Sequence, residues 1–482
     1  MRGQIPKELR ILAFFLLVFL SFFFLQHGPL ATSQGHKFWK KKAKERTEVG
    51  GAEEAVLLYH SFYLDHRDGL PTVRCVGVRQ CQDSLPHPRL QLRRNGRLLT
   101  FPGRSVSVER SCPFAFAPAC AWNPHLFSWQ LSQHFRLRHG DELSLISTDG
   151  DSRQGIVIER QIPAQEPQKF QGHLAVCIPP LYLYADWLQI VQFLEIWLRV
   201  MKAEKFFFYV SSVSENGRKW LAAYEEVELV PWPDLPASGK ALHPERSYYR
   251  LGLHAAINDC LYRTSGRYKY MTVVDVDEYL LALKSPQGLA SFLDGLNWSN
   301  TSSFIFRHAR TVYPHAYRLP TTLRNSSLFS TFRNLQYNRA FAEGDPNKYV
   351  VRPHRVASLA VHSPNRLRGW KKAFLPAENG RLFHLRRYPP DLPSGVDAAN
   401  LTILAGRISD LDSSLRKRAD RTGLPLASMD TEAAVLRSVT RCLTGWKKSG
   451  CKVPHVMCSQ LLQRENIHWH FFNQSASWIL LL

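Results

Sequence analysis

The chain has 482 residues, of which 45% are hydrophobic and 12% aromatic, so it can bury a sizeable core and wholesale disorder is excluded. Lys and Arg outnumber Asp and Glu by 62 to 40, and this net charge of +22 taken alone would fit a basic membrane-surface or nucleic-acid-binding protein. That interpretation ranks last, because the charge is scattered apart from a cluster at Lys37–Arg46 and no RNP-like, zinc-finger or basic-leucine pattern accompanies it. We therefore expect no nucleic-acid partner.

The first segment of the chain predicts a membrane anchor. Ile11–Leu25 is apolar except for Ser21, which is short for a transmembrane helix and long for the core of a signal peptide. No clear small-x-small cleavage site follows, which favours a retained anchor over a removed signal. The next residues are polar, basic and glycine-containing, as in a flexible stem. We expect a cytosolic tail at 1–10, a transmembrane helix at 11–25 and a stem at 26–55.

Two features favour an oxidising lumen for the body of the chain. The nine cysteines include the close pairs Cys75/Cys81 and Cys112/Cys120 and show no Cys-x-x-Cys metal spacing, so we expect disulfides, with their connectivity left open. Five Asn-x-Ser/Thr sequences would accept N-glycans in that compartment. They begin at Asn297, Asn300, Asn325, Asn400 and Asn473.

Residues 56–163 are expected to form a small all-β module, because short strand-like runs alternate with turns such as Asn95-Gly96 and Asp149-Gly150. The expected strands are Val56–Phe62, Thr72–Val78, Leu90–Leu92, Leu98–Phe101, Ser105–Val108, Phe135–Leu137, Glu142–Ser147 and Gly155–Ile158. Gln161–Gln168, with two prolines and no apolar periodicity, is interpreted as a linker.

From residue 172 onward strands alternate with helices, which predicts the α/β class with a parallel, doubly wound sheet. The expected strands are Leu174–Ile178 (stopped by Pro179-Pro180), Lys205–Val210, Val227–Val230 and Tyr270–Val274. The expected helices are Trp187–Met201, Asn216–Glu226 and Arg246–Arg263. We assign this domain to residues 172–400 and expect a helical, cysteine-containing region at 401–482.

Three acids, Asp275, Asp277 and Glu278, follow the last of these strands. In an extended backbone the two aspartates project to one side, ~7 Å apart, and repel each other unless a cation joins them. Their oxygens suit Mn²⁺ or Mg²⁺, ions that are usually shared with a phosphate-bearing substrate. Ligands of doubly wound sheets bind at the carboxyl ends of the strands, where these acids stand. The alternative is a solvated acidic turn.

Other catalytic motifs are absent. No Gly-x-Gly-x-x-Gly follows a strand, and neither a P-loop, nor Gly-x-Ser-x-Gly, nor His-Glu-x-x-His occurs. A nucleotide-binding sheet without a glycine-rich phosphate loop needs another partner for phosphate charge. A metal held by Asp275 and Asp277 would supply it.

Several segments of the chain occur in the order of a known family. The most specific is Asp259-Cys-Leu-Tyr-Arg263 followed by Asp275-Val-Asp-Glu278. The others are Phe62–Arg67, Cys177–Leu181, Glu195, Phe206–Tyr209, Lys348–Pro353, His362 and His384–Arg386. Over roughly Ala55–Arg387 the chain resembles glycosyltransferase family 92.

This resemblance implies a GT-A-like (Rossmann-like) domain that binds a nucleotide sugar, a D-x-D metal site and a single-pass type II anchor in the Golgi membrane. It implies an inverting β-1,4-galactosyltransferase that uses UDP-galactose as donor. The implied acceptor is a galactose- or fucose-terminated glycan on a glycoprotein or glycolipid.

The resemblance also suggests roles for individual residues. Asp277 is expected to contact the metal directly, Asp275 to contact the ribose or a metal-bound water, and Glu278 to orient the pair or face solvent. His384 is expected as an additional metal ligand, with His362 as the alternate, because Mn²⁺ tolerates imidazole.

Further residues would serve the diphosphate and the acceptor. Lys348, Arg352 and Arg386 are expected to steady the diphosphate. The general base that an inverting displacement needs is left open between Glu343 and Asp345.

Two functions from different classes stay open. One is a Golgi glycosyltransferase, and the other is a catalytically silent luminal glycan-binding protein that keeps the fold. Turnover of a UDP-sugar would separate them.

Overall fold

The computed structural model describes residues 56–81, 87–109, 111–147, 153–235, 248–285, 287–312, 327–333, 335–338, 346–385, 398–424, 426, 438, 442, 451, 467–472 and 478–481. The expected tail, anchor and stem lie outside these ranges. Within them, no helix is both long and apolar enough to cross a membrane. The described ranges all belong to one compact unit, Glu53–Leu482.

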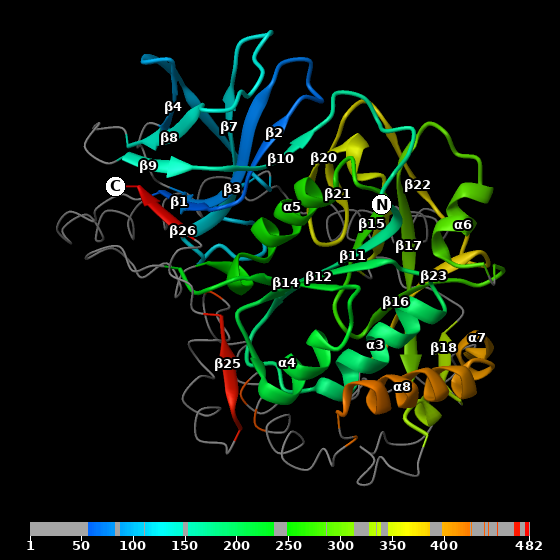
Figure 1. Ribbon diagram of the computed structural model, residues 1–482. Helices are drawn as coiled ribbons and strands as arrows, with labels where there is room; N and C mark the ends of the chain where they lie inside the picture. Colours follow the sequence, from blue (N-terminus) through cyan, green and yellow to red (C-terminus); the bar gives the residue numbers. More distant parts are fainter. Residues whose placement is uncertain are drawn as a thin grey trace, which may run out of the picture. The chain divides into compact units, whose positions relative to one another are not determined.

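Two antiparallel-rich sheets form the first part of this unit (Figure 1). The seven-stranded sheet contains β1 (Val56–Tyr59), β2 (Phe62–Asp65), β3 (Thr72–Gln80), β6 (Gly103–Ser107), β7 (Trp122–Gln130), β10 (Ile158–Ile162) and β26 (Trp478–Leu481). The four-stranded sheet contains β4 (Arg89–Arg94), β5 (Arg97–Phe101), β8 (Glu142–Ile146) and β9 (Arg153–Ile156). Phe62, Leu90, Leu145 and Trp129 share one buried cluster, so side chains of the two sheets pack against each other.

One expected strand of this region is absent. Phe135–Leu137 belongs to the loop between β7 and β8, although Phe135 is buried in the same cluster. The apolar residues of this segment therefore indicate burial in the core, and they do not indicate a strand. The strand β26, from the region expected to be helical, instead pairs antiparallel with β1.

The second part is an eleven-stranded sheet whose centre is parallel, as the alternation of strands and helices predicted. Strands β14 (Val227–Pro231), β12 (Lys205–Val210), β11 (Gly172–Leu181) and β15 (Tyr268–Val273) are parallel neighbours in that order. Antiparallel strands β19 (Lys348–Val351) and β17 (Thr301–Val312) extend it beyond β15.

Helices cover both faces of the parallel strands. α3 (Trp187–Arg199) and α4 (Glu215–Ala222) lie on one side, and α5 (Leu253–Thr264) lies on the other (Figure 1). Alternate side chains of β12 point to opposite faces of the sheet. Phe206 and Phe208 pack in the same buried cluster as the apolar residues of α3, whereas Phe207 and Tyr209 pack in the same cluster as those of α5. This is the burial expected of a central strand in a doubly wound sheet.

The remaining strands are β13 (Ser212–Ser214), β16 (Glu278–Ala282), β18 (Gln336–Asn338), β20 (Val356–Leu359), β21 (Pro364–Leu367), β22 (Lys371–Phe374), β23 (Gly380–His384), β24 (Ala398–Asn400) and β25 (Trp469–Phe471). They complete the eleven-stranded sheet, except that β13 pairs with β25 and β20 pairs with β21 in two separate two-stranded sheets. The remaining helices are α6 (Leu289–Gly295), α7 (Thr402–Ala405) and α8 (Ile408–Thr422), with short 3-10 turns at Tyr249–Gly252, Ser330–Phe332 and Pro353–Arg355.

Two sequence-based boundaries were wrong. β11 continues to Leu181, through the prolines expected to stop it, because its pairing with β12 shifts register between Ile178 and Leu181. Proline has no backbone N–H to donate to a neighbouring strand, and at this irregularity the pairing does not require such a hydrogen bond. α5 begins at Leu253 and not near 246, since the backbone is left-handed at Arg250, Leu251 and Gly252, with φ of 43°, 56° and 64°.

The disulfides join cysteines that are distant in sequence. Those between two described cysteines are Cys81–Cys112, Cys120–Cys451 and Cys177–Cys260, and the last ties β11 to α5. Neither of the pairs that are close in sequence, Cys75/Cys81 or Cys112/Cys120, is a disulfide, so the fold decides the connectivity that the sequence left open. Cys75 stays a buried thiol on β3, and six residues along a strand span ~20 Å, far beyond the ~7 Å limit between Cα atoms of a disulfide.

Candidate active site

The three acids lie in a turn at the carboxyl end of β15. The strand ends at Val273, the chain turns at Val276 and Asp277, and β16 begins with Glu278. The amide of Asp275 donates to Glu278 Oε2 (2.9 Å), and the amide of Glu278 donates to the carbonyl of Asp275 (3.0 Å). This turn replaces the extended backbone on which the ~7 Å spacing of the aspartates was based. The sheet-end location itself is as predicted.

A histidine from a distant part of the chain meets this turn. β16 pairs antiparallel with β23 so that Glu278 and His384 stand opposite each other. His384 Nε2 lies 3.0 Å from Asp277 Oδ2, and His384 Nδ1 lies 3.9 Å from Glu278 Oε1. The amide of Leu385 donates to the carbonyl of Asp277 at 2.7 Å. The pairing of the two strands thus fixes a carboxylate–imidazole pair, and about one-fifth of the Asp277 side chain is exposed to solvent.

A fully buried lysine lies beneath the acids. Lys348 Nζ, at the start of β19, lies 2.8 Å from Glu278 Oε2 and 3.6 Å from Asp275 Oδ2. Burial would lower the pKa of Lys348, but the carboxylates of Asp275 and Glu278 outweigh it and hold the pKa above its usual value. The lysine is therefore charged at neutral pH and neutralises one of the acids.

The same contacts separate the pKa values of the two acids. Desolvation opposes ionisation of Asp275, but Lys348, His384 and Arg250 outweigh it and lower its pKa. Half of the Asp275 side chain is accessible, whereas Glu278 is buried. Burial raises the pKa of Glu278, and Lys348 offsets this only in part. Asp275 thus carries its charge toward the open side and Glu278 faces the lysine.

Arg352 does not join this cluster, contrary to the sequence-based expectation. It follows the other end of β19, so its Cα lies ~13 Å along the strand from Lys348. Its guanidinium donates to the carbonyls of Trp298 (3.0 Å) and Thr301 (2.8 Å), and it is buried. These contacts give Arg352 a structural role at the opposite end of the sheet. The other predicted residues Arg386, Glu343 and Asp345 lie outside the described residues.

Two residues near the acids were not found from sequence. The charge of Arg250 reaches Asp275 and His362, and Arg250 holds an unusual left-handed backbone that no motif announced. The ring of His308, on β17, lies 6.0 Å from that of His384.

His362, the predicted alternate metal ligand, points Nδ1 at the carbonyl of Asn347 (3.2 Å). Burial lowers the pKa of His362, and the nearby charge of Lys348 lowers it further. It lies within electrostatic reach of the acids but is not one of their direct partners.

The donor chemistry of the site fits a hard divalent cation. Asp277 and His384 offer one carboxylate and one imidazole at 3.0 Å, and the accessible carboxylate of Asp275 belongs to the same turn. No group of three His, Cys, Asp or Glu side chains within the described ranges is arranged to hold a metal by itself. A Mg²⁺ or Mn²⁺ ion beside a phosphate needs only one or two protein ligands, with its remaining positions left to substrate and water.

The chain is similar to a sequence family and to solved structures. A model for glycosyltransferase family 92 matches residues 172–418. None of the curated proteins matches. The similar structures include glucosyl-3-phosphoglycerate synthase from Mycobacterium tuberculosis with Mn²⁺, UDP and glucosyl-3-phosphoglycerate (12% identity, TM-score 0.23, 52% of this chain and 81% of that chain). The same enzyme with Mn²⁺ and UDP-glucose gives 13% identity, a TM-score of 0.23 and coverages of 52% and 80%.

The family match includes every residue of the cluster described above, from β11 through the Asp275–Glu278 turn to Lys348 and His384. It spans just over half of the 482 residues. The chain therefore belongs to glycosyltransferase family 92.

Proposed function

We propose that this protein transfers galactose from UDP-galactose to a galactose-terminated glycan, with inversion to a β-1,4 linkage and with a divalent cation at the Asp275–Asp277 turn. The observation that carries the proposal is the Asp277–His384 pair, 3.0 Å apart at the carboxyl end of a parallel strand. Membership in a glycosyltransferase family supports the reaction class. The choice of galactose, of the linkage and of a GT-A-type domain rests on the resemblance to the studied members of the family.

The chain's own residues would divide the work as follows. Asp277 Oδ2 and His384 Nε2 would hold Mn²⁺ or Mg²⁺, and Asp275 would contact the ribose or a metal-bound water. Such an ion supplies positive charge against the negative charge that develops on the departing diphosphate. Lys348 holds Glu278 and Asp275 in place through its ion pairs, so the turn is formed before the donor binds.

Arg250 would add a second positive group on the open side of Asp275. Its side chain is exposed and its backbone is held in a conformation that costs ~1–2 kcal/mol for a residue other than glycine. A strained backbone beside a charged cluster is often retained for function, which makes Arg250 a partner for the diphosphate in place of Arg352. No residue in the described ranges is assigned as general base.

The test is the rate of transfer from UDP-galactose to a β-galactoside, measured in the full-length protein against Mn²⁺ concentration. Asp277→Asn should lower the rate by ~10²–10³-fold, the usual effect of removing one electrostatic stabiliser, and should weaken Mn²⁺ binding measured by electron paramagnetic resonance. Asp410→Asn removes the same charge from an exposed position on α8 and is the matched control.

Three outcomes separate the interpretations. Equal rates for Asp277→Asn and Asp410→Asn would contradict the metal site. Faster transfer from UDP-glucose than from UDP-galactose would keep the transferase but replace the donor. Donor binding without turnover in the parent protein would favour a silent glycan-binding protein.

We also propose a Golgi location with a single-pass type II orientation and a luminal body. The apolar Ile11–Leu25 segment, the disulfides between described cysteines and the exposed side chains of Asn297 and Asn300 support it. Removal of N-glycans should lower the apparent mass of the parent protein, and less so for an Asn297→Gln/Asn300→Gln variant. No change in mass, with the body digested by protease outside sealed microsomes, would place it in the cytosol.

A further inference from the structure

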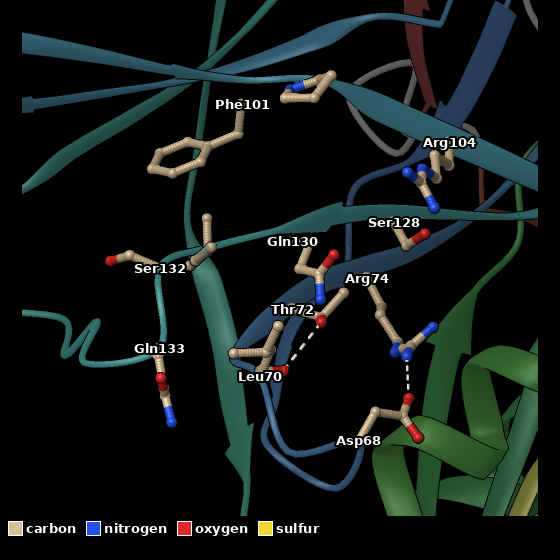
Figure 2. A pocket seen from close by; sticks show the side chains of 12 residues that line it. Asp68, Leu70, Thr72, Arg74, Phe101, Arg104, Ser128, Gln130, Ser132 and Gln133 are labelled. Carbon is tan, nitrogen blue, oxygen red and sulfur yellow. Dashed lines mark hydrogen bonds and ion pairs between the residues drawn. The ribbon is translucent and has the colours of Figure 1, made fainter.

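A polar cleft lies on the first sheet, away from the acids of the β15 turn. Its volume is about 660 Å³, within the range of ligand sites. Twelve residues line it, among them Arg74 on β3, Arg104 on β6, Ser128 and Gln130 on β7 and Phe101 at the end of β5 (Figure 2). None of the twelve belongs to the candidate active site.

Strand register places three of these side chains in one row. Ser128 stands opposite Arg74 on one neighbouring strand and opposite Arg104 on the other. Directly opposed residues of antiparallel strands share a face, so the two arginines flank Ser128 with Cα atoms ~10 Å apart. Figure 2 shows Ser128 between the two guanidinium groups. The intervening residues Phe127 and Trp129 are buried in the core between the two sheets.

The charges of the cleft do not balance. Arg74 is paired with Asp65 at 2.9 Å and also with Asp68, and Asp68 is paired in addition with Arg368. Arg104 is exposed, and no ion pair joins it to any residue that the structure describes. The cleft therefore presents one uncompensated positive charge beside a serine hydroxyl, which favours an anionic ligand.

The uncharged lining indicates what kind of anion would fit. Thr72 and Ser132 offer hydroxyls, Gln130 and Gln133 offer amides, and an apolar surface comes from Leu70, Phe101, Pro102 and Leu131. Hydroxyl and amide groups can each donate and accept, as the many hydroxyls of a sugar require.

We propose that this cleft is a second carbohydrate-binding site, specific for an acidic oligosaccharide whose carboxylate or sulfate lies against Arg104 and Ser128. The choice of a carbohydrate over another anion rests on the chain's membership in a glycosyltransferase family, but not on galactose being the transferred sugar. Binding here needs neither the donor nor a divalent cation.

The experiment is direct binding to the full-length protein by calorimetry in the presence of EDTA. The anionic probes are 3′-sialyllactose, a hyaluronan tetrasaccharide and a chondroitin sulfate tetrasaccharide, and the neutral probes are lactose and chitotetraose. At least one anionic probe should bind at least tenfold more tightly than either neutral probe. The carboxylated and sulfated probes together show which acidic group is preferred.

Arg104→Gln should weaken that binding about tenfold, since it removes a charge-assisted contact. Arg97→Gln is the matched control, because it removes an exposed arginine ~13 Å along β5 from Phe101. Asp277→Asn should bind the oligosaccharide as the parent does, so a failure of the proposed transfer reaction leaves this site intact. The proposal is overturned if no anionic probe binds, if neutral probes bind equally well, or if Arg97→Gln and Arg104→Gln lose the same affinity.

Discussion

Replacement of Lys348 by methionine should destabilise the protein mainly through Glu278. At an effective dielectric constant of about 20, a distance of 2.8 Å to Glu278 corresponds to ~6 kcal/mol of attraction and 3.6 Å to Asp275 to ~5 kcal/mol. Solvent screens the attraction between Lys348 and Asp275, because half of the Asp275 side chain is accessible. Desolvation of the lysine and the glutamate offsets several kcal/mol more of the attraction. We expect a net loss of ~3–5 kcal/mol in the free energy of unfolding, as for other buried pairs that lose one partner.

A second substitution identifies the cause. In Lys348→Met/Glu278→Gln no buried charge remains unpaired at this point, so ~2–3 kcal/mol of the loss should be regained. The Lys348→Met variant should also regain stability as the pH falls toward 5. Without the lysine the pKa of Glu278, already raised by burial, rises further, so Glu278 takes up a proton in the folded state. The loss of stability therefore appears as the pH rises above the pKa of Glu278 in the unfolded chain, ~4.3.

The assay is urea unfolding at pH 7.5 and pH 5, followed by tryptophan fluorescence, with transfer activity measured on the same samples. A Lys348→Met variant within ~1 kcal/mol of the parent, or a double variant no more stable than the single one, would show that the ion pair does not stabilise the fold. If the double variant regains stability but not activity, Lys348 has a second role at the diphosphate.

Two further predictions concern Arg250 and Asp65. Arg250→Gly should raise the KM for the donor about tenfold while leaving the melting temperature equal or higher, because glycine relieves a φ of 43°; an unchanged KM would remove Arg250 from the site. Burial alone would raise the pKa of Asp65, but Arg67 and Arg74 outweigh it and hold the pKa well below its usual value. This stability is present above the unfolded pKa of ~3.9 and is lost as pH falls toward the folded value, so Asp65→Asn should cost ~3–5 kcal/mol at pH 7 and progressively less below pH ~4. A cost that stays constant between pH 7 and pH 3 in urea unfolding would contradict this linkage.

Local patterns were sufficient for much of the parallel sheet. The run Lys205–Val210 is apolar and rich in aromatics, and it is a central strand buried on both faces. Trp187–Met201 repeats its apolar residues at helical spacing, and α3 occupies Trp187–Arg199. In such segments the residues that decide the structure are a few positions apart, so the sequence displays the whole signal.

The sequence-based boundaries of strands were wrong where pairing between distant segments sets them. The prolines after Ile178 are accommodated because β12 shifts its register beside them, and Phe135 is buried without belonging to a strand. The disulfide between Cys120 and Cys451 joins positions 331 residues apart, which no spacing rule anticipates. The division of the chain into a β module at 56–163 and a catalytic domain at 172–400 stays a prediction.

For the candidate site, local patterns were enough to place acids at the end of a buried strand of an α/β sheet, because strand periodicity and the position of Asp275 and Asp277 are local properties. Which distant side chains meet those acids depends on the tertiary fold. The pairing of β16 with β23 brings His384 to Asp277, and the antiparallel direction of β19 brings Lys348 to Glu278 while carrying Arg352 to the other end of the sheet. Strand order and direction are set by packing over the whole core, and that information is not contained in any short segment of the chain.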